Sequence, residues 1–401
     1  MKKTSITLAA GLLIGLASGA SAQGLLSIGQ DASAEDFESG LPFQSTIGVE
    51  FGWDSNPNNA PDDFEADSAF VRGGIDAAYI RSSRTTNFSL NAGFSTLYYF
   101  DRPDDRLEDT FYSARIAANV HHRVNRRLTI GNNLYFSYEI EPDNYIGASA
   151  SRRLDQYLYG YNSVWASYAW TRRFSTLTRY TLTGIDYEED IIAFGEDRLT
   201  HTVSQEMRYV LTRLSTLVGD VRWSTTDYDE DLRNYDAVYV LGGVDHSFSA
   251  DLRGTLRLGA EYRDYDNGGE EWRPYGEGSL RYALDSRTNL VWFNRLGYED
   301  SELGLTTFEN RYVFRSALSV NHQMTKRYRT RAGLTYVHRE FEDGDSSDID
   351  EDLISLHLGL GYRIYTATDH TLNYNFTALG SDRDLREYDR HRISAGLKYT
   401  F

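Results

Sequence analysis

The chain has 401 residues, no cysteine and a formal net charge of −18 at pH 7. The lack of cysteine excludes disulfides as a source of stability, and the negative charge argues against nucleic-acid binding, which needs a basic surface. Aromatic residues make up 14% of a chain that is only 40% hydrophobic. The mean hydropathy of −0.52 is unusual for a helical membrane protein, whose spans each need about 20 apolar residues.

The first 22 residues have the pattern of an export signal. Lys2 and Lys3 precede an apolar stretch from Leu8 to Leu16, and Ala20–Ala22 forms a small-residue cleavage site. Residues 23–42 show no periodicity, and we expect a short periplasmic segment there. No later stretch is apolar enough for a membrane helix, so a membrane-spanning form has to be a closed barrel.

Alternation of apolar and polar residues begins at Phe43. Phe43, Ile47 and Trp53 fall on one face of a strand, whereas Gln44 and Glu50 fall on the other. The pattern recurs to the end of the chain, is weakest in 155–170 and 174–187, and predicts about 18 strands, with 16 as the alternative. The predicted strands are 43–54, 68–81, 86–99, 110–124, 128–140, 155–170, 174–187, 198–211, 215–227, 235–249, 253–265, 271–284, 288–298, 309–323, 328–341, 352–365, 370–380 and 390–401.

The connections between these strands alternate in length. Short turns carry small or basic residues, as in Asn125–Arg127 and Thr325–Arg327, and longer loops carry acids, as in Asp101–Asp109, Glu188–Asp197 and Asp266–Glu271. The unit of two strands and two connections repeats about every 40 residues. Propellers and solenoids have repeats of that length, but their connections would not alternate between short and long. We therefore predict an all-β fold, a single transmembrane antiparallel up-and-down β-barrel over 43–401, with short periplasmic turns and long acidic external loops.

Several outward-going strands end on an aromatic residue followed by an acid. Rings suit the headgroup boundary of a bilayer, so we expect these aromatics to form the external girdle. They are Tyr138, Tyr187, Tyr228, Tyr265, Tyr298 and Phe341.

The last strand, Arg390–Phe401, has two faces and ends on an aromatic residue. Such a strand resembles the terminal strand of bacterial outer-membrane barrels, so Leu397, Tyr399 and Phe401 are the predicted signal for the barrel assembly machinery. The alternative, an edge strand of a soluble sandwich, does not account for the many repeats of the pattern. Lipid and lipopolysaccharide of the outer membrane are the other expected partners.

If Ile393 and Phe401 face lipid, residues of the opposite parity face the lumen. The predicted pore-lining residues are Glu50, Arg115, Glu206, Arg208, Arg222, Arg257, Glu261, Arg263, Glu277, Arg281, Arg311, Arg315, Arg329, Arg331, Arg363, Arg392 and Lys398. An arginine-rich wall would favour anions or sugar acids. Alternatively, the arginines pair with acids across strands and stiffen the wall. A barrel of about 18 strands is too wide to be filled by its wall, so an open or loop-narrowed channel is expected.

The sequence offers no catalytic, cofactor or metal site. The nine histidines are scattered, and no H-E-x-x-H, G-x-S-x-G or phosphate loop is present. We therefore expect no enzyme activity. The acidic run Glu342–Asp352 is a candidate for calcium, but it lacks the spacing of an EF-hand and is more simply a solvated loop.

The first strand closes on Phe51-Gly52-Trp53-Asp54-Ser55-Asn56-Pro57. This ending, the hairpin series and the final G-L-K-Y-T-F resemble the outer-membrane β-barrel porins, a group that includes proteins of exopolysaccharide operons. The motifs are short, and the overall pattern is the distinctive part. The resemblance implies an outer-membrane barrel in a Gram-negative-type bacterium. It assigns no catalytic residue, and it marks Trp53, Asp54 and Asn56 only as a strand-end motif.

Three functions follow as hypotheses. The leading one is a channel for small polar or anionic solutes. The second is a secretion conduit for an exopolysaccharide, which would need a periplasmic partner at 23–42. The third is a structural or adhesive barrel without transport, which a blocked lumen would favour.

Overall fold

The computed structural model describes residues 43–61, 65–101, 109–140, 156–188, 197–229, 234–266, 268–300, 310–342, 349–382 and 386–401. The predicted export signal and the segment 23–42 lie outside these residues. No helix in the described ranges is long and apolar enough to cross a membrane. The strands are β1 (Phe43–Asp54), β2 (Ser68–Ser82), β3 (Thr86–Tyr99), β4 (Thr110–Arg123), β5 (Leu128–Glu139), β6 (Tyr157–Ala169), β7 (Phe174–Tyr187), β8 (Arg198–Val210), β9 (Ser215–Tyr228), β10 (Tyr235–Ser247), β11 (Leu252–Tyr265), β12 (Gly269–Asp285), β13 (Thr288–Asp300), β14 (Asn310–Gln323), β15 (Tyr328–Glu342), β16 (Ile349–Tyr365), β17 (Thr368–Ser381) and β18 (Tyr388–Thr400).

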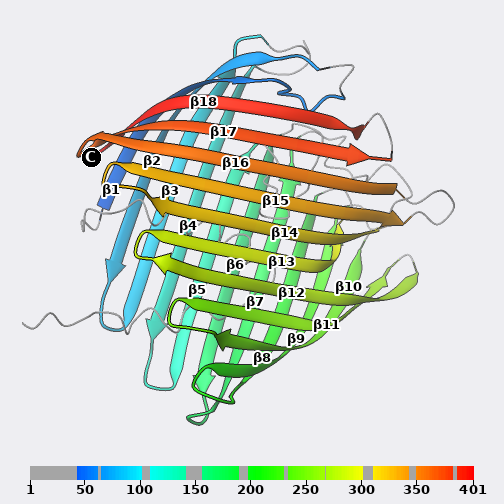
Figure 1. Cartoon of the computed structure of the whole chain (residues 1–401). Helices are drawn as coiled ribbons and strands as arrows, with labels where there is room; N and C mark the ends of the chain where they lie inside the picture. Colours follow the sequence, from blue (N-terminus) through cyan, green and yellow to red (C-terminus); the bar gives the residue numbers. More distant parts are fainter. Residues whose placement is uncertain are drawn as a thin grey trace, which may run out of the picture.

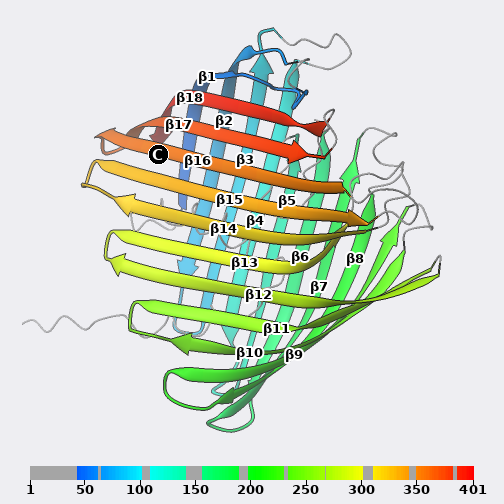
Figure 2. The ribbon, with the colours of Figure 1, turned by 45° about the vertical axis from the view of Figure 1, so that its right-hand side comes forward.

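The strands form one closed antiparallel barrel (Figure 1). Each strand pairs with its neighbours in the chain, and β1 also pairs with β18, where Thr46 lies opposite Thr400. Figure 2 shows β10–β18 crossing in front of β1–β9, so the wall is continuous. The predicted up-and-down barrel of 18 strands is confirmed, and the 16-strand alternative is wrong.

Several strands reach further towards the longer connections than predicted. β12 begins at Gly269 and β16 at Ile349, so the acids Glu270 and Glu351 belong to strands and not to loops. The prediction of a long acidic loop at 266–271 is therefore wrong. β11 and β12 are joined by a tight connection in which Gly268 has a φ of 89°, a value that glycine adopts readily. Acidic residues can continue a strand whose end lies in water, because their carboxylates stay hydrated there.

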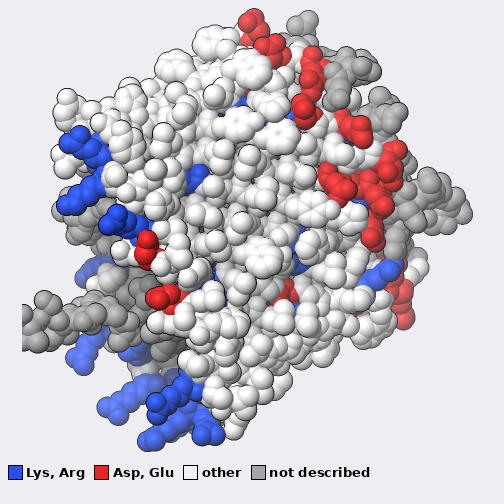
Figure 3. All heavy atoms as spheres, in the orientation of Figure 1, with Lys and Arg blue, Asp and Glu red and all other residues white. Residues whose placement is uncertain are grey.

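Alternation along each strand separates an inner from an outer face. In β1, Phe43, Ile47 and Phe51 are exposed, whereas Gln44 and Asp54 are buried. In the orientation of Figure 3, lysine and arginine gather at the end of the barrel that carries the short turns, and acids gather at the opposite end. The visible face between the two ends is largely free of charge. Such a band is the surface that a barrel presents to lipid.

Four of the six aromatic residues predicted for the girdle are buried and not on the outer face, so this prediction is wrong for them. Tyr187, Tyr228, Tyr265 and Tyr298 are between 1% and 7% exposed, and the first three belong to clusters of buried residues. The side chain of Phe341 lies outside the described part of the structure, and Tyr138 is half-buried. Exposed aromatic side chains stand near both ends of the barrel, among them Trp53, Tyr98, Phe100, Tyr112 and Trp272 near the long loops and Trp170, Phe248, Tyr365 and Phe401 near the short turns.

The buried hydrophobic residues form several separate clusters. One unites Phe70, Leu97 and Phe111 of β2, β3 and β4, and another unites Val313 and Leu353 of β14 and β16 with residues of neighbouring strands. All of these residues lie in the halves of their strands that lead to the longer connections. The barrel wall is therefore most densely packed towards the end that carries the longer connections.

Candidate pore and its inner wall

The predicted pore residues fall on the inner side by alternation along their strands. Glu206, Arg222, Arg257, Glu277 and Arg392 are buried there. Glu50, Arg115 and Lys398 line a hollow on the same side of the wall. The side chain of Arg311 lies outside the described part of the structure. Whether these residues contact a passing solute stays a prediction.

A group of charged residues on β9 and on β11–β16 forms what we call the packed wall. None of its side chains is more than 7% exposed. The packed wall consists of Asp220, Arg222, Glu261, Arg263, Glu277, Glu299, Arg315, Arg339 and Glu351.

Arg222 links two acids from strands that are not neighbours. Its Nη2 lies 2.6 Å from Asp220 on the same strand and 2.7 Å from Glu277 on β12. Glu277 also accepts a hydrogen bond of 2.7 Å from the Tyr275 hydroxyl. Charged groups taken out of water are tolerated only when they are paired and hydrogen-bonded, so this arrangement stiffens the wall.

Arg263 and Arg315 are held in the same way. Arg263 Nε donates to Glu261 at 2.7 Å, and its guanidinium lies 4.3 Å from the centre of the Tyr235 ring. Arg315 Nη2 lies 2.7 Å from Glu299. For the arginines of the packed wall, the structure favours the alternative in which they pair with acids over the one in which they line a path for anions.

Three further predicted arginines also have acidic neighbours. Arg208 and Arg257 share Asp245, which lies 2.8 Å from Arg257 Nη2. Arg208 is also 2.8 Å from Glu206. Arg363, nearer the short turns, lies 3.1 Å from Asp369. The remaining predicted arginines of that half, Arg281, Arg329 and Arg331, are half-buried.

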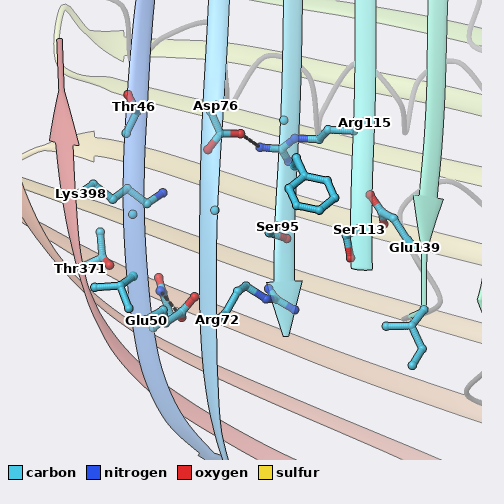
Figure 4. A pocket seen from close by; sticks show the side chains of 17 residues that line it. Thr46, Glu50, Arg72, Asp76, Ser95, Ser113, Arg115, Glu139, Thr371 and Lys398 are labelled. Atoms are coloured by element: carbon cyan, nitrogen blue, oxygen red, sulfur yellow. Dashed lines mark hydrogen bonds and ion pairs between the residues drawn. The ribbon is translucent and has the colours of Figure 1, made fainter. Parts of the chain in front are cut away.

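The opposite side of the lumen holds a recess of about 330 Å³ on the inner side of β1–β5, β17 and β18 (Figure 4). Arg115 Nη2 lies 3.0 Å from Asp76, and these two side chains are 55% and 47% exposed. Glu50 accepts hydrogen bonds from Asn373 Nδ2, at 3.2 Å, and from the Ser394 hydroxyl. The Asp76–Arg115 pair is therefore open to water, in contrast to the pairs of the packed wall.

The strand-end motif lies where the barrel closes. Asp54 is fully buried and accepts hydrogen bonds from Arg390 Nε at 2.9 Å and from the Tyr99 hydroxyl at 3.0 Å. Asn56 donates to the carbonyls of Ala60, at 2.7 Å, and Asp389, at 3.1 Å. Trp53 faces outward and its indole donates to Asp67. The motif therefore joins the first strand to β3 and to the start of the last strand.

The residues of the predicted assembly signal lie on the outer face. Leu397, Tyr399 and Phe401 are 43%, 45% and 67% exposed. The backbone N–H of Phe401 donates to the Ser45 carbonyl at 2.8 Å, which holds the end of the chain against β1. Recognition by the assembly machinery stays a prediction.

Tyrosines on the inner side were missed by the sequence analysis. Tyr157, Tyr159 and Tyr161 of β6 form a buried cluster with Ile185 and Tyr187 of β7. Their spacing of two was visible in the sequence. However, both faces of β6 are rich in apolar residues, and the alternation that separates inside from outside is therefore weak there.

The described residues contain no group of three or more histidine, cysteine, aspartate or glutamate side chains that could hold a metal ion. Most of the acidic run Glu342–Asp352, residues 343–348, lies outside the described ranges.

No protein-family model and no curated protein sequence matches the chain. Among solved structures, it is similar to OccAB4 of Acinetobacter baumannii, with 9% identity, a TM-score of 0.48 and coverage of 90% of this chain and 99% of that one. OpdK of Pseudomonas aeruginosa in complex with vanillate gives 12% identity, a TM-score of 0.48 and coverage of 89% and 99%. A BenF-like porin of Pseudomonas fluorescens gives 11% identity, a TM-score of 0.47 and coverage of 90% of this chain and 99% of that one. At such scores these similarities carry no argument about substrate. The closed barrel of 18 strands is itself the architecture of outer-membrane porins, which the sequence resemblance predicted.

Proposed function

We propose that the chain is an outer-membrane channel that passes small polar solutes. The observation that carries this proposal is the contrast between the two faces of one closed wall. The outer face shows a band with few charges, and the inner side carries a water-exposed recess with charged groups of both signs. A barrel with a largely uncharged outer face and a polar inner side is stable in a bilayer only when polar solvent fills its interior.

Ion selectivity follows from which charges remain open to water. Arginines of the packed wall are paired with acids at close range, so they add little net field to the lumen. Arg281, Arg329, Arg331 and Lys398, which lie in the half near the short turns, are less buried. We therefore propose a weak anion preference set in that half, opposed by the acidic residues at the other end.

The test is the reversal potential of single channels in a planar bilayer across a salt gradient. We expect discrete conductance steps and a modest preference for chloride over potassium. Arg331→Glu is expected to move the preference towards cations and to leave the barrel folded. Purified, folded barrel that gives no conductance steps would contradict the channel function.

A structural or adhesive barrel is the second candidate, because the packed wall and the tyrosine clusters fill part of the interior towards the external end. This function predicts a folded barrel without conductance. The same dense packing gives no support to a wide conduit for an exopolysaccharide.

A further inference from the structure

The recess owes its depth to a row of small residues across the wall. Gly48 lies opposite Lys398 on β18 and opposite Gly74 on β2. Gly74 lies opposite Ser95, and Ser95 opposite Ser113. This row has almost no side-chain volume between β18 and β4, which leaves a hollow whose floor is backbone and hydroxyl groups (Figure 4).

Charged residues border the hollow on both sides. On the side of the long loops, Glu50 lies opposite Arg72. On the side of the short turns, Asp76 and Arg115 lie on either side of Gly93 and form an ion pair. Figure 4 shows these side chains around one space, with the Asp76–Arg115 contact as a dashed line. A solute in the hollow would therefore meet hydrogen-bonding groups on both sides.

Lys398 is the exception among the charged groups at the recess. Asp76 and Arg115 are bonded to each other, and Glu50 accepts hydrogen bonds from Asn373 and Ser394. Lys398 makes neither a hydrogen bond nor an ion pair with any residue of the described ranges. Its ammonium group has three donors and stands at one end of the hollow, so it is available to an anionic group of a bound solute.

We propose that this recess binds a hydroxylated monocarboxylate, such as a sugar acid, with the carboxylate at Lys398 and the hydroxyl groups over the serines and the paired charges. This proposal rests on the proposed channel function and names a solute class for it. The volume of about 330 Å³ falls at the lower end of the range of roughly 300–1,000 Å³ that is common for small-molecule sites.

Other solutes suit the recess less well. A neutral sugar can use the serines and the paired charges, but it leaves Lys398 without a partner. An apolar carboxylate satisfies Lys398, but it places hydrocarbon against polar groups and so forfeits their hydrogen bonds. A polyanion meets the carboxylates of Glu50, Asp76 and Glu139.

The experiment measures interruption of the single-channel current by added solute. Glucuronate is expected to interrupt the wild-type current in a concentration-dependent way, and glucose is expected to act more weakly. In Lys398→Gln the concentration of glucuronate for half block should rise about tenfold, the equivalent of one charge-assisted hydrogen bond. The response to glucose should stay unchanged in this variant.

Two matched controls separate the recess from general effects. Lys326→Gln removes the same charge from the exposed turn between β14 and β15, and it should leave the block by glucuronate at its wild-type level. Gly48→Leu fills the hollow, because a Cβ at Gly48 meets only Lys398 and Leu397 at 3.4 and 3.5 Å and is tolerated. Gly73→Leu adds the same side chain to the outer side of β2, where a Cβ meets nothing within 4 Å. We expect block to be lost in Gly48→Leu and kept in Gly73→Leu.

The outcomes distinguish failure of the proposed binding site from failure of the proposed channel function. Conductance steps with a half-block concentration that is equal in wild type, Lys398→Gln and Gly48→Leu would overturn the recess and leave the channel function intact. If no steps occur, the channel function fails, and calorimetric titration of the detergent-solubilised barrel with glucuronate decides on the recess. Binding that is lost in both variants would support it, and no binding to wild type would overturn it.

Discussion

Burial divides the inner arginines into two groups with different roles. Arg222, Arg263, Arg315 and Arg339 are almost wholly buried against carboxylates and tyrosine rings. Such a group contributes to stability through its partners, because removal of one member leaves the others charged and out of water. Arg331, in contrast, is only half-buried. We expect charge at that position to act mainly on the field inside the lumen.

Arg222→Ala should therefore destabilise the barrel strongly. The change leaves Asp220 and Glu277 buried without the guanidinium that lies between them. We expect a loss of about 3–5 kcal/mol in the free energy of unfolding, measured by urea titration in lipid vesicles.

Arg331→Ala is the control and should change the free energy of unfolding by less than about 1 kcal/mol. Equal losses in the two variants would contradict the division.

A single acid outside the strands should give the barrel a measurable pH dependence. Asp197 is almost fully buried just before β8, and its side chain accepts the Tyr187 N–H at 2.8 Å. Burial, with the nearby charges of Asp186 and Asp229, raises the pKa of Asp197 from 3.8 to about 6. The folded protein thus holds this proton more tightly than the unfolded chain. Its stabilising effect is present at low pH and is lost as pH rises from about 4 through about 6.

Asp197→Asn keeps the acceptor for Tyr187 and removes the charge. We expect the variant to melt at a higher temperature than wild type at pH 7.5, by circular dichroism in detergent. At pH 4 the two proteins should melt together, because wild-type Asp197 is then protonated in the folded state. A difference of the same size at both pH values would show that the charge is not the cause.

Most hairpin turns share a hydrogen-bonding pattern that the alternation of polar and apolar residues did not reveal. In most short turns, the second residue after the strand accepts hydrogen bonds from the backbone N–H groups two and three positions later. Asn125 does so through its amide oxygen, at 2.8 and 2.9 Å, and Thr171 through its hydroxyl, at 3.2 and 2.9 Å. Thr212, Ser249 and Thr325 make the same pair of contacts. Serine, threonine and asparagine suit this position because their side chains satisfy the donors of a tight turn.

The turn between β6 and β7 allows a matched test of this rule. Thr171→Ala removes the acceptor and should cost about 1 kcal/mol of stability in urea titration. Thr171→Asn introduces the residue that occupies the same place in the turn after β4, and should retain wild-type stability. If Thr171→Asn is as unstable as Thr171→Ala, the acceptor is not what stabilises the turn.

Elements were predictable from the sequence where one face is polar and the other apolar. β1 and β18 show this contrast, and their predicted and observed bounds agree within two residues. Contacts between strands far apart in order were not predictable. Arg222 on β9 reaches Glu277 on β12, and Arg208 on β8 reaches Asp245 on β10, because side chains lean along the inner wall. Alternation gives the direction of a side chain but not its partner, so it did not show which arginines are paired.

The whole molecule depends on one junction that no hairpin supports. Seventeen of its strand pairs are neighbours in the chain, but β1 and β18 meet only after the whole sheet has formed. No turn connects these two strands, and the strand-end motif lies beside their junction. Asp54 faces Arg392 across the pair of strands and bonds to Arg390 and Tyr99. A buried carboxylate that gathers groups from β18 and β3 joins the two ends of the sheet.

Asp54→Ala should therefore weaken closure more than any exposed change nearby. The variant leaves Arg390 and Arg392 without the carboxylate that is buried beside them, at a cost of about 3–5 kcal/mol. We expect a smaller fraction of the protein to resist unfolding by detergent at elevated temperature in a gel-shift assay. Asp67→Ala, which removes an exposed acceptor of the Trp53 indole in the loop after β1, is the control and should behave as wild type. If the two variants resist heat equally, the junction is held by its backbone ladder alone, and Asp54 only shapes the loop that follows it.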